Sequence, residues 1–301
     1  MQKFTLVIIG VILLAKAAWA ACPLMTLSNV NSYVNLNTNN FVSLEVRVNK
    51  GSGSCGNFFV VIDNGGASSY STRVLQSNMQ SYPIQFYKDA ARSQILKSEF
   101  EATPSDVLFG TFAGGTTSFN SVYYAYIDAN ANQYIASGNY SKNFLLKLYE
   151  GDFNNRILRD SKVVQFAITQ NKSIDVSMVS TGSAFNITDT TQNIDFGKLV
   201  EGATRGFDIV LLYNAGYSVS MNSTNDGKLK HSTETKFVPY SLTVDGIPIA
   251  LTSVATVVKS ASGISTPNGT RLPVTIKIGS LTDSAPGTYT DTVIVDVSSV
   301  E

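Results

Sequence analysis

Ser137 to Leu148 reads SGNYSKNFLLKL, and Pro286 to Val297 reads PGTYTDTVIVDV. In both stretches a glycine precedes a tyrosine by two positions, and apolar residues then alternate with polar ones. These apolar residues are Tyr140, Phe144, Leu146 and Leu148 in the first copy, and Tyr289, Val293, Val295 and Val297 in the second. Alternation with a period of two predicts a strand with one buried face. The first copy is followed by another alternating run, Val163 to Thr169, whereas only Ser298 to Glu301 follow the second. The sequence therefore predicts two related units, and only the first has a further strand.

Residues 1–20 predict a secretory signal peptide. Lys3 supplies the positive charge, Phe4 to Ala15 form a short apolar segment, and Ala18-Trp19-Ala20 fits a cleavage site. An apolar segment of about 12 residues is shorter than the roughly 20 that span a bilayer. We therefore expect cleavage after Ala20 and a secreted mature chain.

The cysteine and histidine content and the charge of the sequence indicate which ligands and partners to expect. Cys22 and Cys55 are the two cysteines, and an even pair in an exported chain favours a disulfide. A zinc site needs about four ligands, and the single histidine, His231, is distant in sequence. Without Lys3 and Lys16, 20 of the 22 basic side chains remain against 22 acidic ones, a net charge of about −2 with no basic stripe. We expect no metal, no cofactor and no nucleic-acid partner.

The fold class follows from short strand-like runs with turn residues between them, since no long amphipathic helix is evident. Tyr82, Ile84 and Phe86 match Tyr240, Leu242 and Val244 in spacing, which supports a repeated unit. About six or seven strands in each unit suggest an immunoglobulin-like sandwich. We predict an all-β chain with two such domains, residues 21–171 and residues 172–301, the second lacking its final strand.

Several strings resemble the spore coat protein U domain, the subunit type of archaic (Csu-type) chaperone–usher pili. In the second half they are Ile194 to Gly197, Asn214 to Tyr217, Gly227 to His231, Val238 to Tyr240 and Gly287 to Asp291. In the first half, Tyr87 to Arg92 and Gly138 to Tyr140 are similar to pilin subunits of this family. The chain departs from the family in having no cysteine in its second half and an extra stretch between Ser98 and Asn120.

The resemblance implies a sandwich that other chains complete. A periplasmic chaperone would supply the missing strand first, and at the outer-membrane usher the N-terminal extension of an adjacent subunit would replace it. An open sheet edge beside an apolar groove is an aggregation hazard until a strand is added. The edge of this groove would be formed by Tyr289, Val293, Val295 and Val297.

Position in the fibre follows from the other end of the chain. Cys22 comes one residue after the expected cleavage site, so we expect no donor extension. The chain then looks like a two-domain tip adhesin at the cell surface, which attaches cells to host or abiotic surfaces and supports biofilm formation. The alternatives are a two-domain pilus adaptor, a secreted coat protein, or an exported carbohydrate-binding module.

Enzyme chemistry has little support in the sequence. Ser-His-Asp catalysis would have to use His231, which lies in one of the family strings, and no HExxH, P-loop or GxGxxG string is present. We interpret Glu99 with Glu101, and Glu150 with Asp152, as solvated carboxylates. We expect no enzymatic activity.

Strand direction predicts where an adhesive surface lies. In an antiparallel order, the connections at 50–56, 104–120 and 149–162 reach the pole opposite the second domain. Exposed apolar side chains there would form a binding patch, unless about half of them pack beneath their own loops. The candidates are Val107, Leu108, Phe109, Phe112, Phe153, Ile157 and Leu158.

Overall fold

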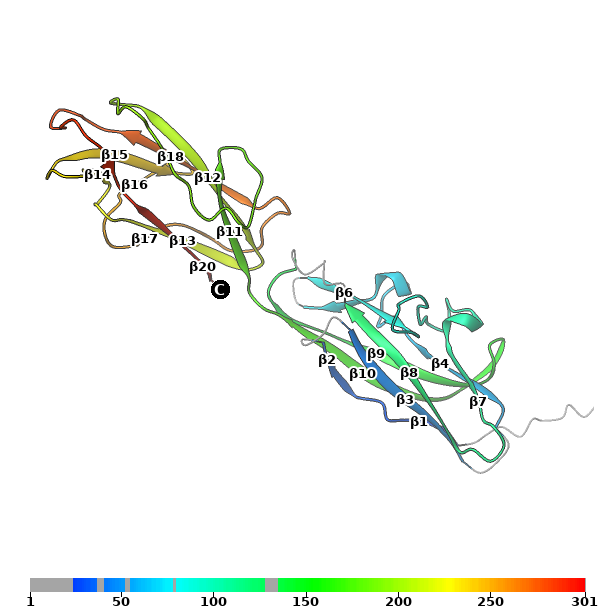
Figure 1. Cartoon of the computed structure of the whole chain (residues 1–301). Coiled ribbons are helices and arrows are strands. Elements are labelled where there is room, and N and C mark those ends of the chain that lie inside the picture. Colours follow the sequence, from blue (N-terminus) through cyan, green and yellow to red (C-terminus); the bar gives the residue numbers. More distant parts are fainter. Residues whose placement is uncertain (1–23, 37–40, 52–54, 78–79, 128–134, 301) are drawn as a thin grey trace, which may run out of the picture.

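The computed structural model describes residues 24–36, 41–51, 55–77, 80–127 and 135–300. The expected signal peptide and Cys22 lie outside the described residues. Figure 1 shows two groups of strands arranged end to end and joined by the segment between β10 and β11. None of the described residues forms a helix with the length and apolar character needed to cross a bilayer.

The first group curls into a sandwich. Its strands are β1 (Met25–Ser28), β2 (Tyr33–Asn35), β3 (Phe41–Lys50), β4 (Asn57–Ile62), β5 (Val74–Gln76), β6 (Ser81–Tyr87), β7 (Leu108–Thr111), β8 (Ser118–Ile127), β9 (Gly138–Asp152) and β10 (Asn155–Gln170). Two 3₁₀ turns, η1 (Tyr70–Thr72) and η2 (Pro104–Asp106), lie between strands. The order is β1-β3-β8-β6-β5-β9-β10-β2, with β4 on β9 and β7 on β4. Phe86, Phe144 and Phe166 pack together in its core, with ring centroids 4.9 to 5.8 Å apart.

The second group repeats this order in part. Its strands are β11 (Ile174–Ser180), β12 (Thr204–Tyr213), β13 (Gly216–Ser223), β14 (Lys228–His231), β15 (Phe237–Val244), β16 (Ile247–Ile249), β17 (Thr256–Ala261), β18 (Thr270–Ile278), β19 (Tyr289–Thr290) and β20 (Val293–Val300). One sheet runs β11-β12-β18-β15-β14-β19 and the facing sheet runs β17-β13-β20. The series β11-β12-β18-β15 matches β1-β3-β8-β6, which confirms the predicted all-β, immunoglobulin-like fold. The domain limits 21–171 and 172–301 stay a prediction.

Asn214 holds the junction between the groups. Its Oδ1 accepts a hydrogen bond from the amide of Ser173 at 2.7 Å, and its Nδ2 donates to the carbonyl of Asn171 at 2.9 Å. Its own carbonyl accepts from the amide of Ser137, just before β9, at 2.8 Å. The β9–β10 hairpin starts from this junction, since Gly138 pairs with Gln170 and the turn lies between Asp152 and Asn155. With 15 residues in β9, the turn lies about 50 Å from the junction at ~3.4 Å per residue.

Candidate functional site

The two copies of the repeated strand have different neighbours. In the first group, β9 pairs with β4 on one side and with β10 along the whole of the other. Tyr140, Phe144, Leu146 and Leu148 are each no more than 1% exposed. This strand therefore lies inside a complete sheet.

The second copy lies at a sheet edge. β20 pairs with β13 and is the last strand in its order, so within the described residues its other side has no ladder partner. Val293, Val295 and Val297 are only partly buried, although they pack against the core. Tyr289 is also half-buried and pairs with His231 in β14. The same alternating pattern is thus less buried where, among the described residues, no second strand pairs with it.

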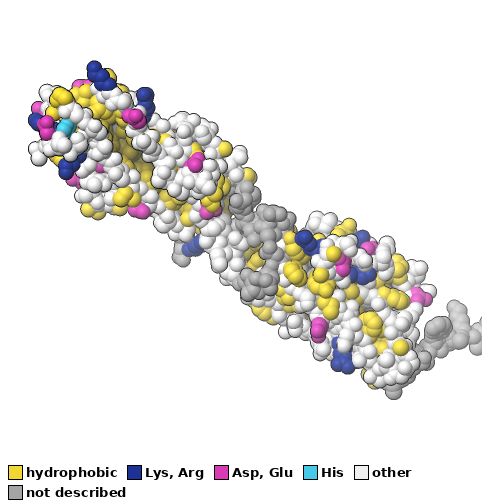
Figure 2. All heavy atoms as spheres, in the orientation of Figure 1, with side chains coloured by type: hydrophobic (Ala, Val, Ile, Leu, Met, Phe, Trp, Pro, Cys, Tyr) yellow, Lys and Arg dark blue, Asp and Glu magenta, His cyan; other side chains and the backbone are white. Residues whose placement is uncertain are grey.

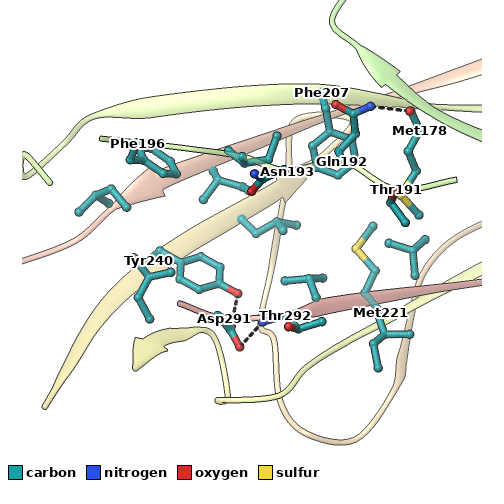
Figure 3. A pocket seen from close by; sticks show the side chains of 18 of the residues that line it. Met178, Thr191, Gln192, Asn193, Phe196, Phe207, Met221, Tyr240, Asp291 and Thr292 are labelled. Carbon is teal, nitrogen blue, oxygen red and sulfur yellow. Dashed lines mark hydrogen bonds between the residues drawn. The ribbon is translucent and has the colours of Figure 1, made fainter. Parts of the chain in front are cut away.

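A cavity of about 500 Å³ lies beside this edge. β20 and the residues just before it form one wall, and residues 190–196, called the strap below, form the other. Met221, Leu242 and Ile276 contribute apolar side chains to its lining. Figure 3 shows Gln192, Asn193 and Phe196 of the strap on one side and Asp291 and Thr292 on the other. Figure 2 shows hydrophobic side chains in a hollow on this face of the second group.

The strap has the burial pattern of a strand without being paired as one. Gln192, Ile194 and Phe196 are half-buried, and the residues between them are exposed. The strap lies between β11 and β12 in sequence, as β2 lies between β1 and β3, and β2 pairs in parallel with β10. The cavity between β20 and the strap is therefore the place that β10 fills in the first group.

Asp291 anchors the start of β20 at the edge of this cavity. Its Oδ2 accepts hydrogen bonds from the hydroxyls of Tyr240 and Ser223, both at 2.6 Å, and its Oδ1 accepts from the amide of Asn225 at 3.1 Å. Burial raises the pKa of the Tyr240 hydroxyl, and the hydrogen bond to Asp291 raises it further. Because these bonds come from β15, from the last residue of β13 and from the turn that follows it, they hold the start of the edge strand in place.

His231 fixes the segment that leads into β19. Its Nδ1 lies 2.9 Å from the amide of Glu234 and accepts that hydrogen bond, so its Nε2 carries the hydrogen donated to the carbonyl of Pro286 at 3.1 Å. Its ring packs edge-on against Tyr289, with centroids 4.9 Å apart. Both ring nitrogens are thus bonded to the backbone in a structural role.

The three connections predicted at the far pole do meet there, in their described parts. The amide of Lys50 donates to the carbonyl of Thr117 at 2.9 Å, and its Nζ lies 5.2 Å from the ring centroid of Phe112. Asn57 pairs with Thr111, and its Nδ2 donates to Oδ1 of Asp152 at 3.1 Å. This end of the molecule is the turn end of the β9–β10 hairpin, away from the junction.

The seven candidate adhesive side chains divide into an exposed, a half-buried and a buried set. Phe109, Ile157 and Leu158 are 48%, 53% and 52% exposed, and we call them the distal apolar set. Phe112 and Phe153 are half-buried against the core clusters.

Exposure of Val107 and Leu108 was a wrong expectation, because both are buried. Part of the segment read as a loop forms β7, which turns Leu108 into the main core, while Val107 packs with Phe59 and Tyr149 on the outer side of the sheet. The stretch read as a third loop is likewise the end of the β9–β10 hairpin.

Phe109 and Leu158 lie at the two ends of one cross-strand row. In register, Phe109 pairs with Phe59, Phe59 with Tyr149, and Tyr149 with Leu158. Phe59 and Tyr149 are buried, and Phe153 packs beside Phe59 with ring centroids 5.4 Å apart. The outer face of this sheet therefore carries an apolar row that is covered in its middle and exposed at its ends.

Phe100 is an exposed aromatic residue that sequence reasoning missed. It is 86% exposed and lies between two anchored carboxylates. Glu99 forms an ion pair with Lys147 and accepts from the hydroxyl of Tyr149 at 3.2 Å. Glu101 accepts from Nδ2 of Asn64 at 2.7 Å. The sequence did show an aromatic residue between two acids, which could have marked Phe100 as exposed. The alternation of apolar and polar residues, however, does not indicate which distant residues bind the two carboxylates.

The solvated interpretation of these carboxylates was wrong for three of them. Glu99 is buried, Glu101 is half-buried, and Glu150 pairs with Arg159. Burial raises the pKa of Glu101, but hydrogen bonds from Asn64, Ser98 and the backbone of Tyr70 lower it below its usual value. Asp152 is exposed and bonded to Asn57.

The predicted disulfide involves one described cysteine. Cys55 is buried, and no described cysteine is a free thiol. Because Cys22 lies outside the described residues, the Cys22–Cys55 pair stays a prediction.

Comparison with known proteins gives one family match. Residues 160–296 match the family model of the Spore Coat Protein U domain, from within β10 to within β20. No curated protein sequence matches the chain.

Among solved structures, one similar chain comes from the CsuC–CsuE chaperone–tip adhesion subunit pre-assembly complex of archaic chaperone–usher Csu pili of Acinetobacter baumannii. It is 15% identical, with a TM-score of 0.43, and the match covers 89% of this chain and 99% of that one. A chain of a chaperone–tip adhesin complex of CFA/I fimbriae biogenesis is 10% identical, with coverage of 90% and 97% and a TM-score of 0.41. The CooA pilin subunit from enterotoxigenic Escherichia coli is 12% identical, with coverage of 50% and 99% and a TM-score of 0.32.

Proposed function

We propose that this chain, whose residues 160–296 match the family model of the Spore Coat Protein U domain, is the tip adhesin of a chaperone–usher pilus. The observation that carries the proposal is the open edge of β20 beside the cavity, at the place where β10 completes the first group. A strand edge with an apolar groove is a site for strand addition, in which main-chain hydrogen bonds give affinity and alternate side chains give specificity.

The first group provides a template for the added strand. β10 runs antiparallel to β9 and parallel to β2, so the donor strand runs antiparallel to β20 and parallel to the strap. The buried residues Val164 and Ile168 of β10 pair with Phe144 and Tyr140, which hold the places of Val293 and Tyr289 in the repeated stretches. The donor strand therefore places apolar side chains opposite Val293 and Tyr289.

Other chains donate the strand that fills the groove. A periplasmic chaperone supplies the strand first, and an adjacent subunit supplies it after passage through the outer-membrane usher. The first group then lies at the distal end of the fibre, with the distal apolar set facing a host or abiotic surface in the early steps of biofilm formation. Burial of apolar side chains releases about 25 cal/mol per Å² removed from water, and many fibres per cell multiply weak contacts.

Gold-labelled antibodies against residues 24–127 test this position on pili from producing cells. We expect label at one end of each fibre. A chain with a copy of residues 155–170 appended after Glu301 fills its own groove, so we expect it to be exported but absent from fibres. Label along the whole shaft would contradict the tip position, and incorporation of the appended chain at the wild-type level would contradict the role of the groove.

A further inference from the structure

The outer face of the β3-β8-β6 sheet carries a group of tyrosines that the proposed function does not use. Along β8, Tyr123, Ala125 and Ile127 point into the core, so Tyr124 and Tyr126 lie on the opposite face and are half-buried. Tyr124 pairs with Ser43 on one side and Tyr87 on the other. Tyr87 is half-buried as well, so part of each of the three rings is exposed on this face.

Arg92 is placed over this surface by a loop with unusual backbone geometry. Its guanidinium carbon lies 4.3 Å from the ring centroid of Tyr126, and the ring of Tyr87 lies 6.3 Å from that ring in an edge-on arrangement. Arg92 has a φ of 62°, in the left-handed region that is uncommon for residues other than glycine. Such strain persists only where the surroundings hold it, and it gathers at ligand-binding sites.

Asp89 holds the loop in this conformation. Its Oδ1 accepts from the amide of Ser93 at 3.1 Å and its Oδ2 from the amide of Gln94 at 2.8 Å, while its carbonyl accepts from the amide of Arg92 at 3.2 Å. The bonds from Ser93 and Gln94 to the carboxylate, that from Ser93 first, lower the pKa of the Asp89 carboxyl. The nearest acid in the loop is therefore committed to the backbone.

The guanidinium keeps its capacity to bind an anion. Among the described residues, no carboxylate forms an ion pair with Arg92, and the side chain is exposed. A guanidinium fork binds a carboxylate through two parallel hydrogen bonds. Tyrosine rings offer rigid contact area with a hydroxyl for hydrogen bonding, and the C–H faces of sugar rings pack flat on such rings.

We propose that this face, formed by Tyr87, Tyr124, Tyr126 and Arg92, binds a glycan that carries carboxylate groups. Sugar rings stack on the tyrosines, and a carboxylate of the glycan binds the guanidinium of Arg92. The site lies on the side of the first sandwich, apart from both the distal apolar set and the groove beside β20. It does not depend on the chain being a pilus subunit.

The test uses the full mature chain and three probes on a biosensor: alginate, a polymer of uronic acids; a sialylated oligosaccharide; and neutral dextran. The main variant is Arg92→Gly, because glycine adopts a positive φ without strain and the fold keeps or gains stability. The matched control is Arg205→Gln, which removes one exposed positive charge from β12 of the second group. A second variant, Tyr124→Ser with Tyr126→Ser, tests the ring contacts.

We expect salt-sensitive binding to an acidic probe, weaker binding to dextran, and a loss of about tenfold or more in Arg92→Gly, as for a lost charge-assisted hydrogen bond. Arg205→Gln should bind as the wild type does. Preference for alginate would assign a matrix polysaccharide, and preference for the sialylated probe an animal-cell glycan. Failure to bind either acidic probe, equal binding to dextran, or unchanged binding by Arg92→Gly would overturn the proposal, and a protein ligand would then be sought for this face.

Discussion

The hydroxyl of Tyr240 donates a 2.6 Å hydrogen bond to Oδ2 of Asp291 and so ties β15 to the residues just before the open edge strand β20. Both residues are part of the lining of the cavity. It helps to explain how β20 keeps its place with a ladder on one side only.

The Tyr240–Asp291 bond makes a pH-dependent contribution to stability. The folded state raises the pKa of the Tyr240 hydroxyl above the ordinary value of about 10. The folded state therefore favours the protonated form, and its contribution is complete below pH ~10 and is lost as pH rises through the folded pKa.

We predict that Tyr240→Phe lowers the free energy of unfolding at neutral pH by about 1–3 kcal/mol, since Asp291 loses a buried donor. Urea denaturation of both proteins at pH 7 and above pH 10 measures the difference, which should shrink with rising pH. A difference that stays constant over this range would show that the hydroxyl does not titrate as the structure requires.

Under the proposed function, the distal apolar set is the surface that attaches. We predict that the triple variant Phe109→Ser, Ile157→Ser, Leu158→Ser loses attachment to hydrophobic surfaces but changes thermal stability little, because all three side chains are about half exposed. The matched control is Val254→Ser with Val257→Ser, two exposed residues of the second group. Attachment assays on polystyrene compare the variants, and full attachment by the triple variant would remove this set from the mechanism.

The substitution Leu108→Ser tests a buried residue next to the exposed Phe109. Leu108 is 6% exposed and packs in the main core, so we predict a loss of about 2–5 kcal/mol and a lower melting temperature. Calorimetry checks this directly. An unchanged melting temperature would place Leu108 on the surface.

The ion pair between Lys147 and Glu99 stabilises the segment that carries Phe100, and substitutions can test this. Their ion pair joins a nearly buried carboxylate to a mostly buried ammonium group, so we predict that Lys147→Met destabilises by about 3–5 kcal/mol through an unpaired buried charge. Adding Glu99→Met should restore part of that loss, and denaturation of the single and double variants gives the coupling. Purely additive effects would show that the pair is not coupled.

We predict a Cys22–Cys55 disulfide in the mature protein. It would close a loop of about 34 residues and contribute roughly 3–4 kcal/mol in the chain-entropy model. Mass spectrometry of the alkylated native protein distinguishes a bridge from two thiols, and double alkylation without reduction would show that no bridge forms.

Sequence alternation predicted the strands that bury one face, because inward and outward positions along β9, β10 and β20 follow the period of two. The difference in pairing between β9 and β20 could also be predicted, since an alternating run follows β9 in the sequence and forms its partner β10. The burial of Val107 and Glu99 could not be predicted from the sequence, because it arises where residues 97–107 pack back onto the outer face of β4 and β9. Contacts between a loop and a distant strand produce no periodic pattern in the sequence. The exposure of Phe100 results from the same packing of residues 97–107.

We propose that the groove beside β20 is a vacant strand position with the geometry of β10. The most direct measurement is the melting temperature of the full mature chain with a copy of residues 155–170 fused after Glu301 through a short turn. The matched control carries Ser at the copied positions of Val164, Phe166 and Ile168, which are buried in β10. We expect a higher melting temperature and slower amide exchange along β20 for the fusion but not for the control. Equal melting temperatures and equal exchange in the fusion, the control and the unfused chain would contradict it.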